Sequence, residues 1–137
     1  RSSIAYLNKS AVVAYAYKYW SSYNPAFRSF KSDCTNFVSQ ALLSGGWMQI
    51  DGDRTANSSW WYNWLLQSYT WAGAQNFFNF TKTKNRGYLA VTKKDYYGNI
   101  YLTYHSSNVK DRPIKDILAK NPNAAYYGWM LHLGYVY

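Results

Sequence analysis

Apolar residues recur at helical spacing in two stretches of the first half of the chain. Residues 10–22 consist largely of alanine, valine and tyrosine, with no glycine or proline before Asn24-Pro25. Residues 34–44 show a similar periodicity and end at a pair of glycines. We therefore predict helices at 10–22 and 34–44. A third helix is expected at 60–71, where four tryptophans and two leucines leave the register open.

In the second half of the chain the pattern changes to that of β-strands. Residues 88–93 and 100–105 are separated by turn residues, which together predict a β-hairpin. An Arg-Pro pair is expected to open a short helix at 112–119, and the aromatic residues of 125–137 predict one or two closing strands. Helices followed by strands indicate the α+β class, with N-terminal helices packed on an antiparallel β-sheet.

The composition indicates a single domain with a substantial core. A chain of 137 residues suits one core, and 48% hydrophobic and 21% aromatic residues exclude an intrinsically disordered chain. Sixteen tyrosines and seven tryptophans exceed what such a core needs, so we expect some of them to line a groove. The chain has no run of about 18 apolar residues, so no membrane insertion is expected.

The net charge of +9 and the pI near 9.6 predict attraction to anionic partners. Nucleic acids and anionic cell walls both meet this condition. The basic residues are scattered, with the densest groups at 82–86, 93–94 and 110–120, and they accompany no nucleic-acid-binding motif. We interpret them as a solvated surface and expect no nucleic-acid partner. The sequence does not predict an oligomeric state.

Cys34 is the chain's one cysteine, so no internal disulfide is possible, and no Cys/His cluster has zinc spacing. No metal or other cofactor is therefore expected. The cysteine begins the predicted helix, where unpaired backbone N–H groups and the helix dipole favour a nucleophilic thiolate. Phe37, Val38, Ala41 and Leu42 follow at helical spacing, so the thiol is expected to face the core. An inert buried cysteine is the alternative.

A catalytic thiolate needs an imidazole to protonate the leaving amine and a polar group to orient that imidazole. The better-placed candidate is His105, at the end of a strand expected to pack near the cysteine helix. His132 lies among apolar residues and is interpreted as a packed side chain. Asn108 is a candidate for the orienting group or an ordinary loop residue. Asp33 is interpreted as the N-cap of the cysteine helix.

The string Asp-Cys-Thr-Asn-Phe-Val-Ser-Gln at 33–40 resembles the signature of the Putative amidase domain family of Gram-positive bacteria, and Tyr104 to Asn108 is similar to that family's second motif. The resemblance implies a papain-like cell-wall cysteine hydrolase that cleaves peptidoglycan amides, at the muramic acid to L-alanine link or within the stem peptide. It also implies a secreted or cell-wall-associated enzyme. On this likeness Cys34 is the nucleophile and His105 falls at the third catalytic position.

The family pattern also has a histidine just before the strand that begins here at Tyr88, but Arg86-Gly87 runs directly into that strand. Three explanations are open: a segment missing at the 87/88 junction, a rewired site with His105 as the base, or a pseudoenzyme. We favour the missing segment, because the flanking residues match the two edges of an intact motif. The alternative function is a non-catalytic cell-wall-binding module, whose surplus aromatic residues stack on sugar rings.

Overall fold

The computed structural model describes residues 3–5, 7–90, 101–104, 109–113, 128–131 and 134–136. This part of the chain contains four helices and six short strands, joined by loops. The helices are α1 (Lys9–Tyr19), α2 (Cys34–Ser44), α3 (Tyr69–Ala72) and α4 (Ala74–Thr83). The antiparallel strand pairs are β1 (Ser3–Ala5) with β6 (Gly134–Val136), β2 (Gly87–Ala90) with β5 (Gly128–Leu131), and β3 (Tyr101–Tyr104) with β4 (Val109–Pro113).

The first two predicted helices are confirmed. Helix α1 ends at Tyr19, three residues before the predicted end, and the Asn8 side chain caps it by accepting a hydrogen bond of 3.1 Å from the backbone N–H of Ala11. Helix α2 has the predicted bounds. The backbone N–H of Gly45 closes its last turn by donating to the carbonyl of Ala41 over 3.1 Å.

The helix predicted at 60–71 is wrong. Trp60 forms an isolated antiparallel bridge with Ile50, and the chain becomes helical only at Tyr69, in α3. The Asn63 side chain accepts hydrogen bonds from the backbone N–H groups of the second and third residues after it, at 2.9 and 2.8 Å. Such side-chain turns compete with helical hydrogen bonding. They fold this segment into a tight loop.

The hairpin predicted between 88–93 and 100–105 is also wrong. β2 pairs with β5, with Gly87 opposite Leu131, whereas β3 pairs with β4. Arg112 and Pro113 are the last residues of β4, and the rest of the helix predicted at 112–119 lies outside the described residues. The closing strands expected at 125–137 are confirmed as β5 and β6. Alternation along a sequence indicates a strand but not its partner, because pairing depends on residues distant in the chain.

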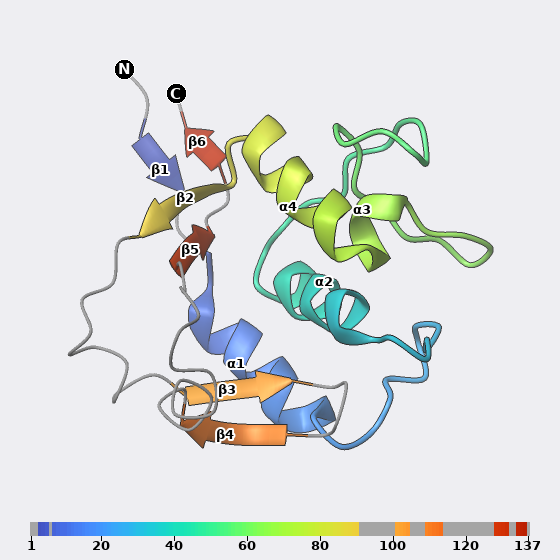
Figure 1. Cartoon of the computed structure of the whole chain (residues 1–137), viewed down its shortest axis with the longest axis vertical. Helices are drawn as coiled ribbons and strands as arrows, with labels where there is room; N and C mark the ends of the chain where they lie inside the picture. Colours follow the sequence, from blue (N-terminus) through green and yellow to red (C-terminus); the bar gives the residue numbers. More distant parts are fainter. Residues whose placement is uncertain are drawn as a thin grey trace, which may run out of the picture.

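The predicted α+β class, with helices packed on an antiparallel β-sheet, is a further correction. Within the described residues the strands form three separate two-stranded pairs, and the architecture is mostly helical. Helix α2 lies between α1 and the α3–α4 pair, and the helices pack mainly on one another (Figure 1). The buried residues of α2, α3 and α4 pack on one another and on aromatic loop residues, so no sheet is needed to bury them.

Tryptophan and phenylalanine rings dominate the core. The buried cluster consists of Leu42, Trp47, Trp60, Trp71 and Phe80. Trp60 lies at its centre, with ring-centroid distances of 5.2 Å to Trp47 and 4.7 Å to Trp71. Because these rings come from the loop after α2, from α3 and from α4, they join three segments around the inner face of α2.

Candidate functional site

Cys34 is the first residue of α2, and its thiol is exposed. Val38, four residues later, is 40% exposed, whereas Phe37 and Ala41 are almost fully buried. Residues four apart lie on the same side of a helix, so Cys34 and Val38 form one exposed stripe beside the buried one. The prediction that the thiol faces the core is therefore wrong, because Cys34 is exposed to solvent.

Asp33 occupies the predicted N-cap position, but its buried side chain makes no capping hydrogen bond to the helix backbone. One carboxylate oxygen, Oδ1, accepts a hydrogen bond of 3.0 Å from the backbone N–H of Phe30 and one of 2.9 Å from Nδ2 of Asn36. The carboxylate therefore connects the loop before α2 to the first turn of the helix. This arrangement orients the backbone from which the Cys34 side chain projects.

Asn36 is fully buried two residues after the cysteine. Besides its bond to Asp33, its Nδ2 group donates to the carbonyl of Arg28 over 2.8 Å, and its Oδ1 accepts from the indole N–H of Trp71 over 2.8 Å. The amide group thus joins the loop before α2, the first turn of α2 and α3. These bonds hold the start of the helix in one position relative to the core.

Two further polar residues of the 33–40 string are buried and hydrogen-bonded. The hydroxyl of Ser39 donates to the carbonyl of Trp71 over 2.7 Å and accepts from the indole N–H of Trp60 over 3.2 Å. The amide oxygen of Gln40 accepts from the hydroxyl of Tyr15. Asp33, Asn36, Ser39 and Gln40 therefore support the fold around the cysteine. This role was not predicted from the sequence, although the spacing of these residues places them on the buried side of α2.

Tyr15 connects α1 to α2 through its hydroxyl group, which donates to Gln40 and accepts a hydrogen bond of 3.2 Å from Nδ2 of Asn24. Burial raises the pKa of Tyr15 from 10.0 to about 12, and the bond from Asn24 offsets part of that increase. The phenol is therefore protonated at neutral pH. It acts as a fixed hydrogen-bond donor between the two helices.

The other candidate catalytic residues, His105 and Asn108, lie outside the described residues, as does His132. Strand β3 ends one residue before His105 and contacts α1, which packs on α2. Gly87 and Tyr88 are consecutive residues of β2. The catalytic roles of His105 and Asn108 and the missing segment at the 87/88 junction all stay predictions.

Neither a metal cluster nor a membrane-crossing helix is found in the part of the chain that the structure describes. Its His, Cys, Asp and Glu side chains form no group of three or more that could hold a metal ion. None of its helices has both the length and the hydropathy required to cross a bilayer.

Comparisons with known proteins find a family match and a related protein. The family described as Putative amidase domain matches residues 6–90, more than half of the 137 residues. The "Uncharacterized protein YhbB" of Bacillus subtilis (strain 168) is 34% identical over 87 residues, which cover 64% of this chain and 28% of that protein. No solved structure matches. The family match includes Cys34 but ends before His105 and Asn108.

Proposed function

Because the chain belongs to the Putative amidase domain family, we propose that it hydrolyses amide bonds with Cys34 as the nucleophile. The observation that carries the proposal is the exposed thiol of Cys34 at the first residue of α2, inside the matched region. The N-terminus of a helix presents backbone N–H groups and the positive end of its dipole, which favour a thiolate and the oxyanion of an acyl-transfer intermediate.

The proposed substrate is peptidoglycan, with the muramic acid to L-alanine amide and the amides of the stem peptide as the two candidate bonds. The net charge of +9 supports an anionic cell wall as the partner, since it attracts the protein to the wall over long range. Such a substrate requires a secreted or cell-wall-associated protein, which we include in the proposal. Metal and other cofactors have no role in it.

The proposed reaction is acyl transfer through a thioester. The thiolate of Cys34 attacks the amide carbon, and the N–H groups of the first turn of α2 hold the oxyanion. Imidazole, with His105 as the candidate, protonates the departing amine, and Asn108 is the candidate for orienting that ring. The C–N bond breaks as the thioester forms. Water then attacks the thioester, releasing the carboxylate product and the thiol.

The test is loss of turbidity of purified Gram-positive cell walls. We expect clearing by the native protein and none by Cys34→Ser, with Val38→Ala as a matched control on the same exposed stripe. We expect His105→Ala to lose clearing and His132→Ala to retain it. Equal clearing by the native protein and the Cys34→Ser variant would reject the proposal, provided both show the same thermal unfolding.

A non-catalytic cell-wall-binding module, or a pseudoenzyme, is the second candidate function. The direct Gly87-Tyr88 junction without a histidine before β2 favours it. In that case the native protein sediments with cell walls at low salt, releases no fragments and behaves like Cys34→Ser. The same wall preparation therefore separates the two candidates, because fragment release and sedimentation are measured in one sample.

A further inference from the structure

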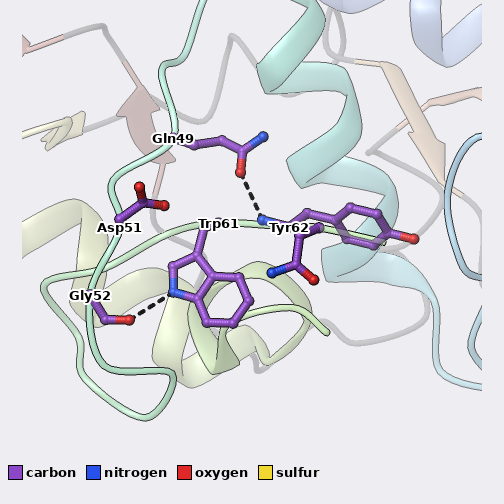
Figure 2. A pocket seen from close by; sticks show the side chains of 6 residues that line it. Gln49, Asp51, Gly52, Trp61 and Tyr62 are labelled. Atoms are coloured by element: carbon purple, nitrogen blue, oxygen red, sulfur yellow. Dashed lines mark hydrogen bonds between the residues drawn. The ribbon is translucent and has the colours of Figure 1, made fainter. Parts of the chain in front are cut away.

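A pocket of about 260 Å³ lies between the segments 49–52 and 61–63 (Figure 2). It is lined by Gln49, Asp51, Gly52, Trp61, Tyr62 and Asn63. The two segments are held together by reciprocal backbone hydrogen bonds of 2.8 Å between Ile50 and Trp60. Because Trp60 is also fully buried in the core, the walls of the pocket are anchored to the buried aromatic cluster.

The indole of Trp61 forms an apolar wall of this pocket. Its Nε1 group donates a hydrogen bond of 3.0 Å to the carbonyl of Gly52, and its backbone N–H donates to the hydroxyl of Ser68 over 3.0 Å. Figure 2 shows the ring extending from the 61–63 segment toward Gly52. The ring's polar atom is therefore satisfied within the protein. A ligand in the pocket would contact the apolar ring of Trp61, which is held in place by these two hydrogen bonds.

Three polar side chains accompany this ring, and backbone N–H groups orient two of them. The amide oxygen of Gln49 accepts from the backbone N–H of Tyr62 over 2.8 Å, and that of Asn63 is occupied by the two backbone N–H groups of its turn. The NH₂ groups of both amides and the carboxylate of Asp51 have no hydrogen bond with the described residues. The pocket thus offers two donors and one acceptor around an aromatic ring.

This combination suits a neutral sugar ring better than an ion. Hydroxyl groups both donate and accept hydrogen bonds, and the C–H face of a pyranose is an apolar surface that can stack on an indole. Asp51 and the lack of any lysine or arginine in the lining disfavour an anion. The two free NH₂ groups disfavour an ammonium ion. The volume lies below the range of about 300–1,000 Å³ of pockets for drug-sized ligands, which fits one ring.

We propose that this pocket is a saccharide subsite that holds one neutral pyranose of a glycan strand. Resting on the proposed function, the subsite would bind the sugar chain of peptidoglycan while Cys34 acts on the attached peptide. Binding at this subsite differs from a charge-driven attachment to the wall, since the lining residues would recognise the shape and hydroxyl groups of a sugar.

Tyr62 and Arg28 connect the pocket to the helix that carries Cys34. The guanidinium of Arg28 lies 4.1 Å from the centre of the Tyr62 ring, and the backbone N–H of Arg28 donates to the Tyr62 hydroxyl over 2.5 Å. The carbonyl of Arg28 accepts from Asn36 in the first turn of α2. A sugar bound beside Trp61 would therefore be held in a fixed position relative to the nucleophile.

The test is titration of the purified chain with a soluble N-acetylglucosamine trimer, followed by NMR of the tryptophan indole N–H signals. We expect the trimer to shift the Trp61 signal. Trp61→Ala should weaken binding about tenfold, because the stacking surface is lost. Asp51→Ala should also weaken it, and the variant should fold normally because its carboxylate makes no hydrogen bond with the described residues. Trp64→Ala is the matched control, since Trp64 is 88% exposed and does not line the pocket.

Cys34→Ser separates this inference from the proposed function. If the variant binds the trimer like the native protein but clears no cell walls, both proposals are supported. Binding without wall clearing by the native protein supports the subsite and rejects the hydrolase. The subsite is rejected if the native protein binds no trimer, if folded Trp61→Ala and Asp51→Ala bind it normally, or if a lysine-containing peptide and not the sugar shifts the Trp61 signal.

Discussion

Trp71 donates its indole N–H to Oδ1 of Asn36 across 2.8 Å, in a region where both residues are fully buried. This bond joins α3 to the first turn of α2, two residues after Cys34. A core tryptophan therefore contributes to the placement of the exposed thiol. The contact explains how the position of an exposed side chain can be held by a buried hydrogen bond.

Asn36→Ala is expected to destabilise the chain by about 2–4 kcal/mol, because it leaves the Trp71 indole N–H and the Arg28 carbonyl without their buried partner. The measurement is the free energy of unfolding in urea. Thr35→Ala, at the neighbouring half-buried position, is the control. An Asn36→Ala variant as stable as the native protein would show that the network does not support the helix start.

Gly45→Ala is expected to cost about 1–3 kcal/mol through overpacking. An added Cβ would lie 2.4 Å from Cγ2 of Val12 and 3.1 Å from Cδ1 of Leu7. The φ angle of Gly45 is −85°, which suits alanine, so the effect is steric. The double variant Gly45→Ala/Val12→Ala should recover part of the stability. No recovery in the double variant would contradict this account of the α1–α2 contact.

Tyr15→Phe is expected to lower the free energy of unfolding by about 1 kcal/mol at neutral pH, because Gln40 loses its hydrogen-bond donor. The pKa of Tyr15 is raised to about 12 in the folded chain, so its protonated form is the one that stabilises the fold. The stabilisation by protonated Tyr15 is complete below pH 10 and is lost as the pH rises toward 12.

The pH dependence is measured as the difference in unfolding free energy between the native chain and Tyr15→Phe. The difference should narrow between pH 10 and pH 12. Tyr23→Phe, at an exposed position, is the control variant. If the difference in unfolding free energy stays constant between pH 10 and pH 12, ionisation of Tyr15 is not what weakens the fold in this range.

Arg28→Lys is expected to destabilise the chain by about 1–2 kcal/mol although the charge is kept. The guanidinium donates to Oε1 of Gln67 over 3.1 and 2.9 Å and to the carbonyl of Asn63 over 2.9 Å, a fork that one ammonium group cannot reproduce. Limited proteolysis should cut the 63–66 loop faster in this variant. Lys31→Ala, an exposed substitution, is the control, and equal cutting rates would reject the prediction.

Local signals predicted α2 to the residue, because both of its ends are marked within a few positions of the chain. Asp33 occupies the N-cap position, and Gly45 closes the last turn. The helix predicted at 60–71 was wrong, because that prediction depended on apolar content alone. There the Asn63 side chain forms a turn with its neighbours, and the bridge between Ile50 and Trp60 depends on a segment ten residues away.

The sequence by itself determined the position of Cys34 at a helix N-terminus and the family to which the chain belongs. Only the tertiary structure decided that its thiol is exposed and that Asn36 and Ser39 are internal supports. It also decided how the strands pair and that Trp61 lines a pocket. The physical reason is that caps and periodicity act over a few residues, whereas burial and pairing depend on which distant segments meet when the core forms.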